Sequence, residues 1–290
     1  MTAWKIFHVI FRLTTPMHIG CGKSGNLQRT YQFVTGRVFW GALTARITRN
    51  NPEAMQQHGH QAYQMFGNQV HQDMAYTYFY PAVENCNGFE VQWPWAPGFN
   101  TRHIRTFAST ALSYPEQHAQ EATLHETEYL SSVTCDTGKQ VYLRGYVFMK
   151  KSSALQWQKA LERLQFGGER SYGWGNVELK KCDELEKNAE LFEGLARFIN
   201  HDIPLIELPE LSEGRILAHT KAENVPAHGQ TEPLAGREWR SDSDDQSQHA
   251  AGQNISVNAF CFTPGSKVTS LPYRFKIGAH GMWISQEGSP

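Results

Sequence analysis

Four glycines, an arginine, a serine and two aromatic residues lie within nine consecutive positions, Gly167-Gly-Glu-Arg-Ser-Tyr-Gly-Trp-Gly175. Glycine permits positive φ and lets another backbone approach closely. Arg170, Ser171 and Tyr172 add a cation, a hydroxyl and a stacking plane, a combination that suits a sugar-phosphate chain better than a small neutral metabolite. The alternative is a turn that packs across a sheet, and composition alone does not separate the two interpretations.

Other motifs give little support for cofactor or metal chemistry. The stretch Gly20–Gly25 contains Gly-Lys-Ser, but Met17 occupies the place where a phosphate-binding P-loop needs glycine. His125 stands beside Glu126 and Glu128, a grouping that a metal site could use and that an exposed polar turn also explains. The five cysteines are widely spaced, without a C-x-x-C pair. The sequence therefore predicts no cofactor, no metal and no disulfide framework.

Composition indicates a globular protein with a near-neutral charge. The chain has 290 residues, of which 40% are hydrophobic, a mean hydropathy of -0.52 and a formal net charge of -1. No apolar run is long enough to span a bilayer and the start does not resemble a signal peptide, so we expect a cytoplasmic protein. A nucleic-acid binder usually carries a basic excess. Any RNA site must therefore be local, or shared with other subunits.

Several elements must position these residues. Lys5–Leu13 reads as a central strand, and Thr35 as the N-cap of a helix that ends near Asn50. Val141–Met149 is the clearest strand, with odd positions facing a core and even positions forming an aromatic face that includes Arg144. The remaining elements are a strand over Tyr76–Tyr80, a helix that starts at a capping box at Ser153 and contains Trp157, Leu161 and Leu164, and a strand over Asn176–Lys181.

The order of these elements is strand, helix, strand, strand, helix, glycine-rich loop, strand. This is the βαββαβ signature of an α+β ferredoxin-like fold, the topology of RNA-recognition domains. We expect it to cover residues 1–182, with a long insertion at about 50–140. Residues 183–290 form a C-terminal extension whose strand and turn signals predict a smaller β-rich lobe.

Three motifs, in this order, resemble the RAMP superfamily of CRISPR-associated proteins. Leu13-Thr-Thr-Pro-Met-His-Ile-Gly20 is similar to the family's opening after the first strand, and Val34–Leu43 to the segment in which its first helix begins. Phe166–Val177 resembles its hallmark glycine-rich motif. Two positions depart from the pattern: Thr35 replaces a proline, and Arg37 takes the place of a small residue.

The resemblance implies a non-catalytic subunit that binds CRISPR RNA (crRNA), and possibly target RNA, and assembles with other effector proteins in antiviral defence. A type III-like subunit that caps the crRNA 5′ handle is favoured, with a backbone subunit as the alternative. The implied RNA-binding residues are His18, Lys23, Arg29, Arg37, Arg144, Gly167, Gly168, Arg170, Ser171, Tyr172, Gly173, Trp174 and Gly175.

Enzymatic alternatives remain open at this point. A ribonuclease that processes precursor crRNA without metal would use a histidine such as His18 as general acid or base. A metal-dependent nuclease for target RNA would need an aspartate, and Asp73 and Asp136 are the only ones before residue 183. Neither matches a transferable motif, so no catalytic residue is assigned. A ferredoxin-like scaffold that binds no RNA is the remaining possibility.

Overall fold

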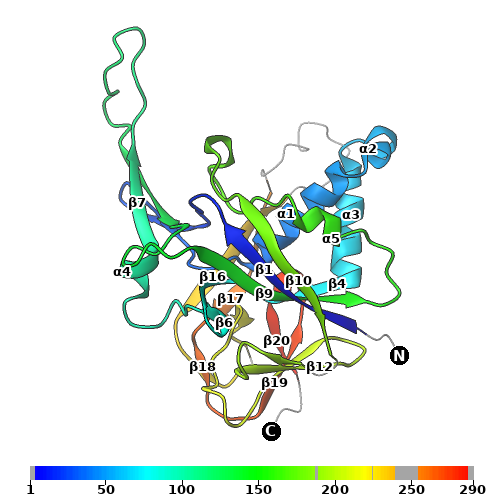
Figure 1. Cartoon of the computed structure of the whole chain (residues 1–290). Coiled ribbons are helices and arrows are strands. Elements are labelled where there is room, and N and C mark those ends of the chain that lie inside the picture. The colour runs from blue at the N-terminus through cyan, green and yellow to red at the C-terminus, as the bar shows by residue number, and fades with distance from the viewer. Residues whose placement is uncertain (1–3, 187–188, 224, 239–253, 287–290) are drawn as a thin grey trace.

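The protein is described here by a computed structural model, which covers residues 4–186, 189–223, 225–238 and 254–286. The chain is mixed α+β and rich in strands, which form several sheets with few helices between them (Figure 1). Among these residues, no helix is long and apolar enough to cross a membrane.

A six-stranded sheet forms the centre of the molecule. Its strand order is β10-β1-β9-β5-β6, and β4 pairs with β9 beside β5. Every pairing is antiparallel. The bounds of these strands are β1 Trp4–Leu13, β4 Met74–Tyr76, β5 Tyr80–Asn85, β6 Gly88–Val91, β9 Val141–Lys150 and β10 Val177–Leu185.

Helices cover one face of this sheet. Phe39, Leu43 and Ile47 recur every four residues on α1 and are all buried against the odd positions of β9. The Thr35 side chain accepts a hydrogen bond from Val38 N and so caps this helix, as its sequence predicts. The helices are α1 Gly36–Arg49, α2 Pro52–His58, α3 Gln61–Asp73, α4 Phe99–His103 and α5 Gln158–Leu161.

The C-terminal residues form an eight-stranded sheet that covers the other face. Its order is β11-β12-β13-β19-β20-β14-β17-β16, and a second core lies between it and the even positions of β9. Figure 1 shows this sheet below the central one, opposite the helices. The strands are β11 Glu190–Leu191, β12 Ala196–Ile199, β13 Leu205–Leu208, β14 Thr220–Lys221, β16 Thr231–Glu238, β17 Asn254–Phe262, β19 Tyr273–Ile277 and β20 Trp283–Ser285, with β15 Ala227–His228 and β18 Lys267–Val268 pairing separately.

A four-stranded sheet projects from this body. Its order is β2-β3-β8-β7, with β2 at Gly20–Ser24, β3 at Leu27–Thr30, β7 at Ile104–Ser109 and β8 at His125–Leu130. Beyond β7 and β8 the chain extends as a long arm away from the body (Figure 1). The stretch Gly20–Gly25, which shows no P-loop pattern, is thus part of a β-hairpin.

Several sequence predictions hold and several are wrong. The strand at Lys5–Leu13, the helix after Thr35 and the strand at Val141–Met149 are confirmed. The single strand predicted over Tyr76–Tyr80 is instead split between β4 and β5, because Phe79 pairs with Val34. The capping box at Ser153 is wrong as well: its hydroxyl donates to Asp73 Oδ2, and α5 has only four residues.

A buried polar chain joins the central body to the C-terminal sheet. His219 is fully buried, and its Nδ1 and Nε2 lie 2.8 Å from Tyr78 Oη and 2.6 Å from Glu232 Oε1. The same carboxylate oxygen accepts a hydrogen bond from Tyr31 Oη at 2.8 Å. Four side chains from the two layers therefore supply one another's hydrogen-bond partners. Removing one of them leaves buried polar groups without a partner.

We expect His219→Ala to lower the free energy of unfolding by about 3 kcal/mol, because it leaves Tyr78 Oη unsatisfied and opens a cavity. Chemical denaturation measures the change. His228→Ala is the matched control, since His228 is exposed on β15. Equal stability of the two variants would show that the chain of hydrogen bonds does not hold the two layers together.

The buried histidine His103 and two partly buried ones, His8 and His280, should make the fold sensitive to acid. Burial lowers the pKa of His8 and of His103 to about 4, and that of His280 to about 3; Arg144, Arg102 and His71 respectively lower these pKa values further. Each histidine is neutral when folded, whereas the unfolded chain takes up protons below about pH 6.5. The unfolded state then binds more protons, so stability should fall as the pH falls from about 6.5 towards 4.

Urea denaturation across this pH range tests the expectation. His103→Leu removes one titrating group. The loss of unfolding free energy between about pH 6.5 and 4 should therefore be smaller in this variant by up to about 3 kcal/mol. His118→Leu, at an exposed position of the arm, should leave the profile as it is. A profile that does not respond to His103→Leu would contradict this explanation.

Candidate nucleic-acid interface

The Gly-rich loop (residues 167–175) is closed by the segment that follows β1. Gly168 N donates to His18 O at 2.8 Å, and Gly175 N donates to Pro16 O at 2.6 Å. Phe166 N donates to Gly175 O at 2.8 Å and brings the two ends of the loop together. Between these bonds the backbone makes a single 3₁₀ turn over Arg170–Tyr172. The loop is thus a compact structure docked on a neighbouring backbone.

The four glycines of the loop have two different roles. A Cβ on Gly167 would lie 2.0 Å from His18 O, and one on Gly175 would lie 1.9 Å from Phe166 O; both residues have positive φ. These two positions require glycine for packing. At Gly168 and Gly173 a Cβ would meet nothing closer than 3.6 Å and 4.0 Å. Gly173 has a positive φ of 80° at the end of the 3₁₀ turn, which favours glycine for its backbone conformation. Local structure therefore accounts for three of the four glycines and leaves only Gly168 unexplained.

The side chains of the loop also fall into two groups, those that pack within the protein and those exposed to solvent. Trp174 is half-buried and packs edge-on against Tyr129 and Phe107 at the base of the arm. Arg170 Nε donates to Gly167 O at 3.1 Å, while Ser171 and Tyr172 are exposed, Tyr172 at 78%. Trp174 is a packing residue, and the 3₁₀ turn carries the groups that can meet a ligand.

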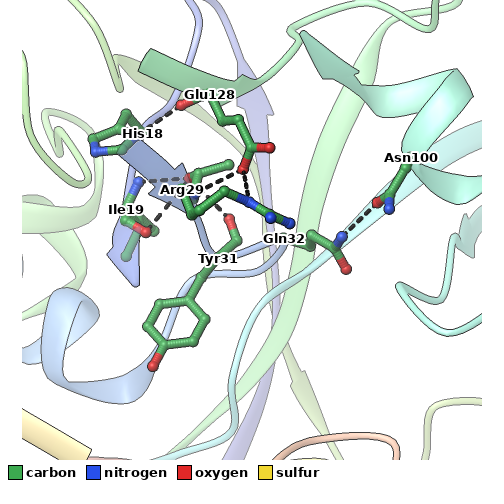
Figure 2. A network of polar contacts seen from close by, with 8 residues as sticks. His18, Ile19, Arg29, Tyr31, Gln32, Asn100 and Glu128 are labelled. Carbon is green, nitrogen blue, oxygen red and sulfur yellow. Dashed lines mark hydrogen bonds and ion pairs between the residues drawn. The ribbon is translucent and has the colours of Figure 1, made fainter. Parts of the chain in front are cut away.

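His18 anchors a polar network behind the loop (Figure 2). Its Nδ1 lies 2.7 Å from Glu128 O, and because a carbonyl oxygen only accepts, this nitrogen carries the proton. The Glu128 carboxylate accepts from Arg29 Nε at 2.8 Å and from Thr30 N at 3.2 Å. The network fixes β3 against β8. It leaves His18 only 6% exposed.

A small hollow lies at the start of α1, and Arg37 is one of the residues that line it. Lys23 is exposed on β2. Arg37, in the first turn of α1, lines a cavity of about 340 Å³ together with Tyr31, Gly20 and Gly22. A cation, an aromatic ring and uncovered glycine backbone therefore meet at the start of α1, where backbone N–H groups favour an anion.

Arg144 does not belong to this surface, because the aromatic face predicted on β9 is buried. Arg144 is 9% exposed, and its guanidinium donates to His8 Nε2 at 2.9 Å, to Phe89 O at 2.8 Å and to the Glu193 carboxylate. The C-terminal residues cover Tyr146 and Phe148 on this face, and the donors of Arg144 are taken up by β1, β6 and Glu193. The role of Arg144 is structural.

The aspartates considered for nuclease chemistry are both engaged within the protein. Asp73, at the end of α3, accepts from Ser153 Oγ at 2.7 Å. Asp136, in the turn between β8 and β9, accepts from Arg102 Nε at 2.8 Å. Over the described ranges, no three histidine, cysteine or carboxylate side chains group as a metal site would require. Each aspartate is therefore held by a partner within the protein.

Sequence reasoning missed three arginines near the Gly-rich loop: Arg46 and Arg49 on α1, and Arg163 before the loop. Burial lowers the pKa of Arg170, and the positive charge of Arg49 lowers it further. The spacing of Arg46 and Arg49 indicates a common helix face. No sequence pattern shows that this face lies beside residues more than a hundred positions away.

Comparison with known proteins supports the fold. No family model matches the chain, and no curated protein does. A chain of the type III-B Cmr-beta complex bound to cognate target RNA and AMPPnP is 9% identical, with a TM-score of 0.50, over 89% of this chain and 84% of that chain. Two further Cmr-beta chains, one from the complex with cognate target RNA and one from the apo state, are each 10% identical over 61% of this chain and 96% of theirs, with TM-scores of 0.43 and 0.42. The likeness to the first chain shows a shared fold.

The docking of the Gly-rich loop can be tested with two neighbouring glycines. Gly167→Ala should lower the free energy of unfolding by at least about 2 kcal/mol, because Ala disfavours positive φ and its methyl group meets His18 O. Gly168→Ala should change stability by less than about 0.5 kcal/mol, since its Cβ has room. Thermal and chemical denaturation provide the comparison. Two equally stable variants would mean that the loop does not pack on His18.

Proposed function

We propose that the protein is a non-catalytic RAMP subunit that binds crRNA within a type III-like CRISPR effector complex. The observation that carries the proposal is the Gly-rich loop docked on the segment that follows β1, within a fold shared with a Cmr-beta chain. The loop offers uncovered backbone, the cation of Arg170 and the ring of Tyr172, and the neighbouring hollow adds Arg37. These groups suit a single-stranded sugar-phosphate chain.

The ferredoxin-like interpretation forms part of the proposal. Strands β1, β5, β9 and β10 lie in the order β10-β1-β9-β5, all antiparallel. Helix α1 connects β1 towards β5, and α5 lies between β9 and β10. This arrangement is the one expected of a βαββαβ unit. In this interpretation α2, α3, the arm and the C-terminal sheet are additions to that unit.

The role among RAMP subunits is proposed from the same residues. A subunit that caps the crRNA 5′ handle remains the favoured assignment, with a backbone subunit as the alternative. The expected partners are crRNA, target RNA and the other proteins of the effector, in the cytoplasm. A net charge of -1 fits a subunit whose RNA is also held by its neighbours.

RNA binding by the full-length protein tests the proposal. Fluorescence anisotropy with labelled single-stranded RNA at about 50 mM salt should show binding that weakens towards about 200 mM. Lys23→Gln combined with Arg170→Gln should weaken it by about tenfold, because each arginine or lysine lost removes a phosphate contact. Arg197→Gln with Lys267→Gln, both exposed in the C-terminal lobe, is the charge-matched control.

Two results would contradict the proposal. The first is the absence of RNA binding by the wild-type protein, alone and when isolated with its neighbouring effector proteins. The second is cleavage of repeat RNA by the purified protein in EDTA, abolished by His18→Ala. That outcome would support the metal-independent ribonuclease instead, with His18 Nε2 as the proton acceptor.

A further inference from the structure

Four arginines gather where the C-terminal half of α1 meets the chain before and within the Gly-rich loop. Arg46 Nε donates to Arg163 O at 2.9 Å and so joins the helix to the segment after α5. Arg46 and Arg49 are three residues apart on α1. The pKa of Arg170 is lowered mainly by burial and also by the positive charge of Arg49. We call these residues, Arg46, Arg49, Arg163 and Arg170, the arginine cluster.

The arginine cluster has no internal counter-charge. Within the described part of the chain, none of its four guanidinium groups forms an ion pair with a carboxylate. Glu162 and Glu169, their neighbours in sequence, are not paired with them either. Burial lowers the pKa of Arg46, and Arg49 and Arg163 lower it further, the effect of like charges close together. A second molecule that supplied negative charge would relieve this repulsion.

Helix electrostatics explains only part of the cluster. Arg46 and Arg49 lie in the last turn of α1, where cations stabilise the helix dipole. Arg163 and Arg170 come from other segments, and both are exposed. Their guanidinium groups add to the repulsion without any benefit to α1. The dipole therefore does not account for the convergence of the three segments.

We propose that the arginine cluster binds the phosphate backbone of single-stranded RNA and extends the Gly-rich loop into a continuous path along α1. This inference rests on the proposed function. All four cations are arginines, whose planar forks match phosphate oxygens in pairs. Arg170 belongs to both surfaces, and Tyr172 in the same turn is 78% exposed and can stack on a base. The aromatic plane favours RNA over an acidic peptide.

The test uses the full-length protein and the double variant Arg49→Gln with Arg163→Gln. Neither side chain makes a hydrogen bond or ion pair in the described structure, so the fold should be retained. The affinity for labelled single-stranded RNA should fall about tenfold at low salt. Each phosphate contact contributes about 0.7 to the slope of log affinity against log salt, so the slope should become shallower by about 1.4.

The controls separate this inference from the proposed function. Arg49→Lys with Arg163→Lys should keep most of the salt slope, because the charges remain. Arg197→Gln with Lys267→Gln should change neither affinity nor slope. If Lys23→Gln with Arg170→Gln weakens binding and Arg49→Gln with Arg163→Gln does not, the path along α1 is wrong and the RNA-binding loop stands. If the wild-type protein binds no RNA, both proposals fail.

Competition with poly-glutamate distinguishes the other class of partner. We expect poly-glutamate at matched charge concentration to displace the RNA poorly, since it offers no bases for Tyr172 to stack on. Tyr172→Ala should narrow the difference between the two polyanions. Equal competition by poly-glutamate, unaffected by Tyr172→Ala, would overturn the assignment to RNA and identify the cluster as a docking site for an acidic protein segment.

Discussion

Strand β9 is buried on both faces from Val141 to Met149, and the rest of the molecule depends on this constraint. An apolar strand covered on one side only would leave a large hydrophobic surface in water. The helices cover its odd positions and the C-terminal sheet covers its even ones. The second interface includes polar groups, which must be paired when water is removed. Arg144 donates to Glu193, and Tyr146 Oη accepts from Phe192 N, so these bonds set the position of the C-terminal lobe on the strand.

This layering determines where a ligand can bind. The C-terminal sheet covers one face of the central sheet and helices cover the other. Within the described residues, the end of the central sheet at which β1 stops, where Leu13 pairs with Val177, is not covered by either layer. The segment 14–20, the Gly-rich loop and the turn into β9 all emerge there, and the arm is attached beside them. The proposed interface lies at this end because the faces are occupied.

The sequence allowed the local structure of these elements to be predicted better than their surroundings. Thr35 and the spacing of Phe39, Leu43 and Ile47 define α1 without any tertiary information. Alternation along β9 placed Arg144 on one face with Tyr142 and Tyr146, but it could not show that residues near position 190 cover that face. Ser153 begins a capping-box pattern in the sequence. Its hydroxyl instead donates a hydrogen bond to Asp73, which is distant in the sequence. Gly167 and Gly168 are adjacent glycines that the sequence does not distinguish. Only the position of the His18 carbonyl shows that Gly167 must be glycine for the loop to pack.

The net charge of the chain did not predict where its surface is positive, because ion pairs neutralise some cations and leave others unpaired. Several cations elsewhere on the molecule are neutralised locally, as in the pairs of Lys5 with Glu184, Arg12 with Glu178 and Arg102 with Asp136. The arginine cluster is not neutralised in this way within the described residues. Screening confines electrostatic effects to about 10 Å at moderate salt, so distant carboxylates do little to offset the cluster. A chain with a formal charge of -1 can thus present a locally positive surface at the arginine cluster. The balance of charge over the whole chain keeps attraction to other polyanions low and restricts the proposed binding to the cluster and the Gly-rich loop.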